Sequence, residues 1–394
     1  MRYNIIMYSC MLPRGGFCMK KLNIGLIGFG SMGKVHAYCV DNLKYYYSPL
    51  DFDAKIYGVC TTTEKKSAAV AREYGFSVAT TDEDVLINDP NIDVIDICTP
   101  NIYHYETLKK AIAAKKHVYC EKPLCVTSDE ANEIARLAKD SGLICNVVFN
   151  NRFLAPFLRA KQIIDDGKLG RILSFSAEYL HNSCTDIKRP AGWKQDRNIC
   201  GGGVLFDLGS HVLDLVYFLC GEFESVNGCS QIAFKTRAGA DGSEWQTNAD
   251  EAFYLTATLK CGAMGTVSVS KLAVGSNDDL NLCIYGEKGS IKFNMMQPNF
   301  LYFYDGTSRS GALGGNAGYT AIECVGRYPT PGGLFPAPKS PSSWLRGHVG
   351  SMYEFLSSVS TGIPHSPDFS DAAHVQAVME AAYRSDKERR EIKI

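Results

Sequence analysis

The chain lacks an excess of either charge and any long apolar run. Its 41 Lys and Arg stand against 42 Asp and Glu, giving a net charge of −1. It therefore lacks the basic surplus typical of a nucleic-acid-binding protein, and we expect no nucleic-acid partner. No uninterrupted run approaches the roughly 18 apolar residues of a membrane span, so we expect no membrane association. The 45% apolar and 21% charged fractions exclude global disorder and a fibrous repeat.

The 15 cysteines include no CxxC pair. The closest two, Cys120 and Cys125, do not have zinc-ligand spacing, so we expect no metal site. Others, such as Cys98 and Cys145, lie inside apolar runs. This usage favours buried, reduced thiols and a cytoplasmic location.

The first 18 residues lack the pattern of a secretory signal. Their short apolar stretch is interrupted by Asn4 and Ser9 and is followed by no small-residue cleavage site. Met19-Lys20-Lys21-Leu22 resembles a natural start before a first strand. We therefore interpret 1–18 as an N-terminal extension without a catalytic role.

Residues 19–150 are predicted to form an α/β domain with a parallel sheet. Short apolar runs of strand character alternate with helical patterns of 10 to 15 residues, which is typical of βαβ units. The strands are expected at 22–28, 55–60, 93–98, 117–120 and 143–149, and the helices at 31–43, 65–74, 105–114 and 127–141.

The pattern changes after about residue 150, which predicts a second domain over 151–394. A helix is expected at 157–166 and a strand at 173–180, followed by several strands between 226 and 304 that form an antiparallel sheet. Residues 306–341 are rich in Gly, Pro and Ser and predict a long surface excursion. Helices resume at 349–359 and 371–384, and we leave open whether they pack back on the first domain.

Residues 28–33, Gly-Phe-Gly-Ser-Met-Gly, form a GxGxxG motif between a predicted strand and a predicted helix. This context indicates a dinucleotide-binding turn. Gly28 permits the tight turn, Gly30 lets a pyrophosphate approach the backbone, and Gly33 lets the helix pack on the sheet. Phe29, Ser31 and Met32 complete the predicted contact loop, and the N-terminus of the helix supplies free N–H donors.

The end of the second strand does not decide between NAD and NADP. A carboxylate there would favour NAD and an Arg would favour NADP, but the chain has Thr61 and Thr62, which suit either ribose. Lys65 and Lys66 follow on a helix, where lysines are usually solvated. The absence of an Arg favours NAD, with NADP as the alternative.

Three further stretches carry a family resemblance: CTPNIYH at 98–104, EKP at 121–123 and GGGVLFDLGSH at 201–211. Together with the glycine loop, they resemble the Gfo/Idh/MocA family from residue 19 to the C-terminus. The resemblance implies a Rossmann domain followed by an open, mostly antiparallel sheet that binds substrate and forms a homo-oligomer. It also implies NAD(P)-dependent oxidation or reduction of a sugar, a cyclitol or a related polyol.

The resemblance also implies roles for particular residues. The turn of Thr99, Pro100 and Asn101 matches the loop that contacts the cofactor near its nicotinamide, and His104 and Glu121 belong to the same group. Lys122 matches the family's EKP lysine. Asp207 and His211 match its aspartate and histidine near the reacting hydroxyl.

The residues themselves support this chemistry. Alcohol oxidation needs a base that titrates near neutral pH, which makes His211 a natural acid/base. Asp207 precedes it by four residues, so we expect both on one helical face, with Asp207 orienting the imidazole or a substrate hydroxyl. Lys122 ends a strand at the ligand-binding edge of the sheet and is predicted to relay the proton.

Further polar and aromatic residues are substrate-binding candidates. Asn150 and Arg152 lie where the chain crosses between domains, and Tyr179, His181, Trp193 and Lys194 follow on the first strand and loop of the second. The aromatic segment 45–52, with Tyr319, Tyr328, Phe335 and Trp344, covers either a large aglycone or an oligomer contact.

The sequence therefore predicts a sugar or glycoside dehydrogenase, resembling relatives that oxidise C3 of glucosides. An inositol or free-hexose dehydrogenase is the enzyme alternative. A non-catalytic dinucleotide-binding regulator is the second alternative, against which the intact Lys122, Asp207 and His211 argue.

Overall fold

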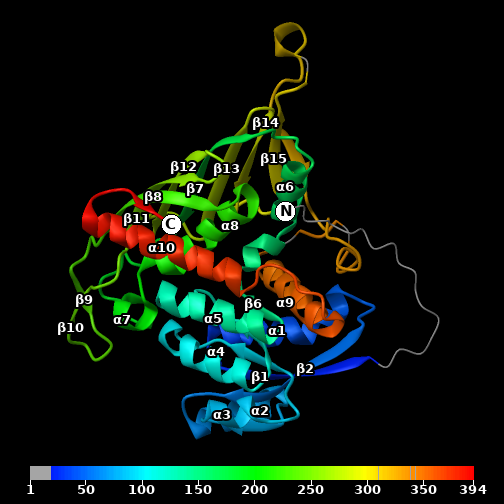
Figure 1. Cartoon of the computed structure of the whole chain (residues 1–394), viewed down its shortest axis with the longest axis vertical. Coiled ribbons are helices and arrows are strands. Elements are labelled where there is room, and N and C mark those ends of the chain that lie inside the picture. Colours follow the sequence, from blue (N-terminus) through cyan, green and yellow to red (C-terminus); the bar gives the residue numbers. More distant parts are fainter. Residues whose placement is uncertain (1–18, 309, 338, 342) are drawn as a thin grey trace.

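The computed structural model describes residues 19–308, 310–337, 339–341 and 343–394, so the predicted extension 1–18 lies outside the described residues. In this part of the chain, two large sheets organise the molecule. Figure 1 shows the blue and cyan N-terminal part below the green and yellow sheet, with α10 (Phe369–Glu388) in red running between them.

The first sheet has six parallel strands in the order β3-β2-β1-β4-β5-β6, which confirms the predicted Rossmann domain. The sequence analysis did not predict the short strand β3 or the short helix α3, because three to five residues carry too little periodicity. The strands are β1 (Lys20–Ile27), β2 (Phe52–Cys60), β3 (Val78–Thr80), β4 (Val94–Ile97), β5 (His117–Cys120) and β6 (Cys145–Val147). The helices are α1 (Ser31–Tyr46), α2 (Glu64–Tyr74), α3 (Glu83–Ile87), α4 (His104–Ala113) and α5 (Ser128–Ser141).

The ends of these helices follow from local sequence. The Thr63 side chain accepts from the N–H of Lys66 to begin α2, and Gly75 ends that helix with a φ of 76°. At the start of α5, Thr127 and Glu130 form a capping box. For both helices, the boundaries predicted from the sequence lie within about two residues of the observed ones.

The second sheet has nine strands in the order β16-β15-β14-β13-β7-β12-β11-β8-β17. It is mostly antiparallel, as predicted, except that β7 and β12 pair in parallel because a long crossover of helices and strands separates them in sequence. The strands are β7 (Ile172–Leu180), β8 (Phe223–Gln231), β11 (Ala252–Leu259), β12 (Met264–Ser270), β13 (Asp279–Gly286), β14 (Gly289–Asn294), β15 (Phe300–Asp305), β16 (Thr320–Glu323) and β17 (Ile392–Lys393). A separate hairpin joins β9 (Thr236–Ala238) to β10 (Glu244–Gln246).

Helices connect the two sheets. Besides α10, they are α6 (Ala155–Asp165), α7 (Arg197–Cys200), α8 (Ser210–Cys220) and α9 (Trp344–Thr361). α9 packs against α1 and α10 packs against α5, so both C-terminal helices return to the Rossmann part (Figure 1). The stretch Arg197–Cys220 has the length and mean hydropathy of a membrane span, 1.5, but 78% of that window is buried, as in a core helix.

The predicted surface excursion contains a strand that the sequence did not indicate. β16 lies within it and extends the second sheet beside β15. The aromatic segment before β2 packs inside the same chain, with Tyr47 stacked on Tyr353 of α9 at 3.7 Å and Tyr46 edge-on to Phe335 at 5.3 Å. Tyr46 and Tyr47 therefore bind α9 and the excursion rather than an aglycone.

Arg152 corrects a substrate-binding prediction. It lies in the 3₁₀ turn Asn150–Phe153, is 3% exposed, and its Nε donates to Asp214 Oδ2 at 2.9 Å. Its guanidinium also lies 4.9 Å from the Phe218 ring centre. A buried Asp214 on α8 needs such a partner, so Arg152 ties the 3₁₀ turn to α8 and does not line the cavity.

We predict that Arg152→Met destabilises the protein by about 3–5 kcal/mol, because it leaves the buried Asp214 carboxylate without its cation. Urea unfolding measures this change in free energy. Arg136→Met is the control, since Arg136 forms an exposed i,i+4 pair with Asp140 and its loss costs less than about 0.5 kcal/mol. Equal effects of the two variants would contradict the structural role.

Candidate active site

A cavity of about 690 Å³ opens between the carboxyl ends of the first sheet and the helical segment that carries α8. Residues from both halves of the chain line it, which places the site where doubly wound sheets bind ligands. The sequence-predicted residues that it brings together are Gly28, Phe29, Gly30, Ser31, Met32, Thr61, Thr62, Thr99, Pro100, Asn101, Glu121, Lys122, Asn150, Tyr179, His181, Trp193, Lys194, Asp207 and His211.

The glycine loop has the shape that a dinucleotide requires. Gly28 has a φ of 95°, and a Cβ there would lie 2.5 Å from the Cys98 carbonyl oxygen. A Cβ on Gly33 would lie 2.4 Å from the Gly28 carbonyl oxygen, so Gly33 serves helix packing and does not line the cavity. A Cβ on Gly30 meets nothing within 4 Å, and no side chain caps α1. The open space and the free N–H groups fit a pyrophosphate.

Among the described residues, the segment after β2 contributes Thr61, Thr62 and Lys66 to the cavity lining and no carboxylate or arginine. The hydroxyls of Thr61 and Ser67 hydrogen-bond each other at 2.8 Å, so Thr61 is engaged within its own loop. Thr62 remains exposed, and Lys66 joins it in lining the cavity. Of the two predicted ribose contacts, only the Thr62 side chain therefore stays open, and Lys66, which was expected to be solvated, lines the cavity beside it.

His104 corrects a second prediction. It is fully buried and does not line the cavity. Its ring nitrogens lie 3.0 Å from the carbonyl oxygens of Pro123 and Thr99. It therefore braces the loops that follow β4 and β5 and does not contact the cofactor space itself.

A buried histidine fixes the EKP loop. His36 Nδ1 lies 2.9 Å from an Asp96 oxygen, and His36 Nε2 lies 3.2 Å from Glu121 Oε1. Burial disfavours the charged ring, but Asp96 and Cys98 raise the pKa of His36 well above its usual value. Glu121 Oε2 then accepts the backbone N–H of Lys122 at 3.1 Å. This chain of contacts positions Lys122 just beyond the carboxyl end of β5.

Lys122 and Asp207 meet across the domain boundary. Lys122 Nζ donates to the Asp207 carbonyl oxygen at 2.6 Å and to Oδ1 at 3.2 Å. Burial lowers the pKa of Lys122, and the Asp207 charge opposes that shift. A lysine with a lowered pKa exchanges protons more readily near neutral pH than an exposed one.

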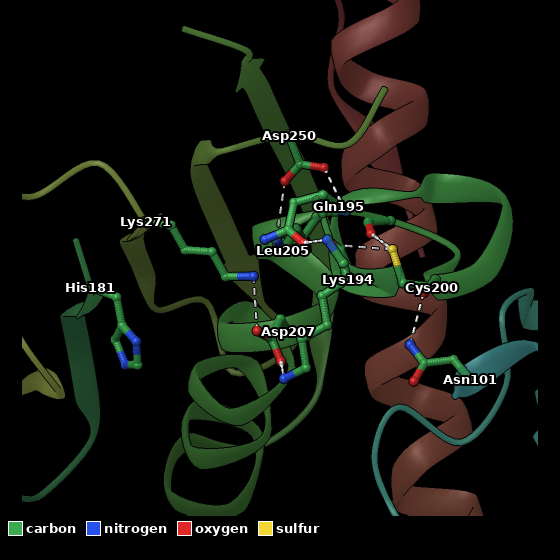
Figure 2. A network of polar contacts seen from close by, with 12 residues as sticks. Asn101, His181, Lys194, Gln195, Cys200, Leu205, Asp207, Asp250 and Lys271 are labelled. Atoms are coloured by element: carbon green, nitrogen blue, oxygen red, sulfur yellow. Dashed lines mark hydrogen bonds and ion pairs between the residues drawn. The ribbon is translucent and has the colours of Figure 1, made fainter. Parts of the chain in front are cut away.

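Asp207 is surrounded by cations. Its Oδ1 also accepts from Lys194 Nζ at 2.7 Å, and its Oδ2 lies 2.9 Å from Lys271 Nζ (Figure 2). Burial alone would raise the pKa of Asp207, but Lys271, Lys122 and Lys194 hold it well below its usual value. The Asp207 oxygens face the lysines, so of the two predicted tasks the structure does not support orientation of the His211 imidazole, and orientation of a substrate hydroxyl stays a prediction.

His211 lies in the first turn of α8 and faces the cavity. Burial and the nearby Lys122 charge hold the pKa of His211 well below its usual value. Its Nδ1 is buried and has no hydrogen-bond partner among the described residues. The imidazole is therefore neutral at physiological pH and can accept a proton from a ligand hydroxyl.

Asp250 shapes the backbone before Asp207. Its Oδ1 accepts the N–H of Gly203 at 2.8 Å and its Oδ2 accepts the N–H of Leu205 at 3.1 Å (Figure 2). A Cβ on Gly203 would lie 2.1 Å from the Asp250 carbonyl oxygen, which explains the glycine. The turn continues as a π-helix over Leu205–Gly209, and α8 follows directly from Ser210. Asp207 therefore lies in a π-helical turn and His211 in an α-helical turn.

The structure adds residues that the sequence did not reveal. Tyr179 Oη donates to Asp278 Oδ1 at 2.5 Å, and His181 Nε2 lies 3.1 Å from the same oxygen. Trp344 and His348 reach the cavity from α9. The sequence had named Trp344 among the aromatics that cover an aglycone or form an oligomer contact, and Tyr179 and His181 as substrate candidates. No sequence signal identifies Asp278 or His348, since their neighbourhood depends on how distant segments pack.

Asn101 joins the cofactor loop to the second domain. Its Nδ2 donates to the carbonyl oxygen of Cys200 at 2.8 Å (Figure 2). Cys200 also lines the cavity at the end of α7. The contact closes one wall of the cavity with backbone and amide groups.

Comparison with known proteins agrees with this geometry. Residues 22–149 match the oxidoreductase family model with an NAD-binding Rossmann fold, and residues 157–292 match the GFO/IDH/MocA C-terminal domain. The chain belongs to the Gfo/Idh/MocA family. It is therefore an NAD-binding oxidoreductase of a family that acts on CH–OH groups, as the motifs predicted.

Two curated relatives and one solved structure illustrate the family. Levoglucosan dehydrogenase of Pseudarthrobacter phenanthrenivorans is 30% identical over 93% of this chain and 96% of its own. D-glucoside 3-dehydrogenase of Escherichia coli is 29% identical over 54% of this chain and 58% of its own. A levoglucosan dehydrogenase structure with NADH and L-sorbose superimposes with a TM-score of 0.91 at 30% identity, covering 95% of this chain and 99% of that one.

We predict that Gly30→Leu abolishes measurable NADH binding, because its side chain fills the open space above the N-terminus of α1. Fluorescence titration with NADH measures the dissociation constant. Gly318→Leu is the matched control, since a Cβ there also meets nothing within 4 Å but the residue lies outside the cavity. Equal affinities in the two variants would contradict the assignment of the glycine loop.

Proposed function

We propose that this protein oxidises a secondary hydroxyl of a sugar or glycoside with NAD, reversibly, and that C3 of a glucoside is the reacting position. The observation that carries the proposal is the meeting of a neutral His211 with the Lys122–Asp207 pair in the cavity that the glycine loop enters. The names of the relatives, levoglucosan dehydrogenase and D-glucoside 3-dehydrogenase, support the substrate class and the C3 position.

In this proposal each group has one task. A nicotinamide bound beside the glycine loop would supply the acceptor for the hydride of the carbon that bears the hydroxyl. The neutral His211 accepts the hydroxyl proton as the carbonyl forms. Lys122 donates a hydrogen bond to the substrate oxygen and relays the proton onward, and Asp207 keeps Lys122 and Lys194 in place.

The far wall of the cavity suits a polyhydroxylated ligand. Asp278 is hydrogen-bonded through one oxygen to Tyr179 and His181, and no hydrogen bond occupies its Oδ2 within the described residues. A carboxylate accepts strong hydrogen bonds from sugar hydroxyls. Trp193, which is 37% exposed, offers an apolar face for a pyranose ring, and Asn150 adds an amide.

The proposal extends to assembly and location. Tyr254, Met264 and Tyr285 are exposed and lie on one face of the second sheet by strand register, which suits a homo-oligomer through that face. The described cysteines are all free thiols, which suits the reducing cytoplasm.

An inositol or free-hexose dehydrogenase remains the enzyme alternative. A non-catalytic regulator is disfavoured by the assembled acid/base groups.

Incubating the protein with NAD and a panel of glucosides, free hexoses and inositols, and following absorbance at the reduced nicotinamide band, tests the proposal. Glucosides are expected to give the highest kcat/KM. A preference for inositol or a free hexose would favour the enzyme alternative. No turnover with any member, despite NADH binding, would favour the regulator.

We predict that His211→Ala lowers kcat by about 10²–10⁴-fold while NADH affinity stays within twofold, because the residue supplies the base from the second domain. Single-turnover hydride transfer measures the effect. In the unaltered enzyme, activity does not fall between pH 8 and pH 6, because the pKa of His211 lies well below its usual value and protonation removes the base only at lower pH. His365→Ala is the control, since His365 is exposed. Normal transfer by His211→Ala at every pH would assign the base to Lys122.

We predict that Asp278→Asn lowers kcat/KM for the best sugar by about 10–100-fold, the loss of one charge-assisted hydrogen bond of about 1.5–3 kcal/mol. NADH binding is expected to remain unchanged. The neighbouring Asp279→Asn is the control, because Asp279 hydrogen-bonds Asn281 on the sheet and does not line the cavity. Equal sugar kinetics in both variants would remove Asp278 from the substrate site.

A further inference from the structure

Lys271 is a buried lysine beside the proposed catalytic centre. It directly follows β12, and its side chain is 6% exposed. It does not line the cavity, so it contacts neither cofactor nor substrate there. A buried ammonium group is costly unless a strong partner compensates for its lost hydration.

Asp207 is that partner. Lys271 Nζ lies 2.9 Å from Asp207 Oδ2, while Lys122 and Lys194 both bind Oδ1. Figure 2 shows Lys271 and Lys194 approaching the carboxylate from opposite sides. One oxygen is therefore tied to the second sheet, and the other points to the groups that line the cavity.

We propose that Lys271 is a positioning residue for hydride transfer, which holds the Asp207 carboxylate in the rotamer that directs Oδ1 to Lys122. The proposal rests on the proposed function, because it assigns Lys271 to the same reaction. Lys271 acts through Asp207 and touches no reacting atom.

The three lysines are not equivalent anchors. Lys194 is 46% exposed and lies on a short 3₁₀ turn, so its long side chain keeps much of its freedom. Lys122 is the group whose proton is to move in the reaction. Lys271 is the cation held in the core, and its Asp207 contact keeps it charged by raising its pKa against the effect of burial.

Loss of Lys271 releases one end of the carboxylate. Asp207 then rotates about its Cβ–Cγ bond, and Oδ1 no longer stays between Lys122 and Lys194. Because the hydrogen bond from Lys122 to the substrate oxygen depends on that placement, the rate of transfer falls. NADH affinity stays the same, because the glycine loop is untouched.

The experiment compares Lys271→Met and Lys271→Gln with Asp207→Asn and with the double variant Asp207→Asn/Lys271→Met. Single-turnover transfer with the best sugar, the KM for that sugar and the dissociation constant of NADH are measured for each. Arg237→Met is the structural control. It breaks another buried ion pair at the same end of the second sheet, with Glu251, without touching Asp207.

We expect Lys271→Met to lower the transfer rate by about 10–100-fold with nearly unchanged NADH affinity, a small part of the loss that a full acid/base group causes. Lys271→Gln, which keeps an N–H donor for Oδ2, is expected to lose less. In the Asp207→Asn background, Lys271→Met is expected to add no further loss, because its target is already altered. Arg237→Met is expected to lower thermal stability but not the transfer rate.

Three results would overturn the proposal. They are a normal rate in both Lys271 variants, equal rate losses in Lys271→Met and Arg237→Met, or full additivity in the double variant. If Lys271→Met does not fold, the Lys271→Gln series decides in the same way. The proposed function fails separately, if Asp207→Asn and His211→Ala both transfer hydride normally or if no panel sugar reacts.

Discussion

The Asp207 carboxylate holds the two halves of the active site together. Lys122 reaches it from the end of the Rossmann sheet, and Lys194 and Lys271 reach it from the second domain. Without this anion, three ammonium groups would lie within one small volume and repel one another. These three cations therefore depend on the one negative charge of Asp207 that they share. Burial and the Lys122 charge lower the pKa of the nearby His211, while the Asp207 charge opposes this shift.

The backbone around Asp207 is built to place that charge. Asp250 holds two N–H groups of the preceding turn, and Gly203 is the residue type that leaves room for it. Asn101 then ties the cofactor loop to the end of α7. α9 closes the arrangement from the C-terminal end, since Trp344 and His348 reach the cavity while other residues of α9 pack on α1. Cofactor space and substrate space thus share their walls, which suits direct transfer between two ligands.

The class of reaction and the choice of substrate depend on different parts of the molecule. Family membership accounts for the cofactor and for the class of reaction. In our proposal the choice of substrate depends on groups outside the shared motifs, chiefly Asp278 with its partners Tyr179 and His181, and the residues of α9 that line the cavity.

The sequence by itself determined the Rossmann sheet and the position of the glycine loop, and it singled out Lys122, Asp207 and His211 as candidates for the reaction. Each of these depends on a local pattern: a strand, a turn and a helix start within a few residues. Only the tertiary structure decided that Arg152 pairs with Asp214, that His104 braces loops, and that Asp207 faces lysines instead of His211. It also revealed Asp250, Lys271 and Asp278, whose neighbours lie tens of residues away in the chain. The physical reason is that the charge and hydrogen-bond partners of a buried group are set by packing between distant segments, which no local periodicity records.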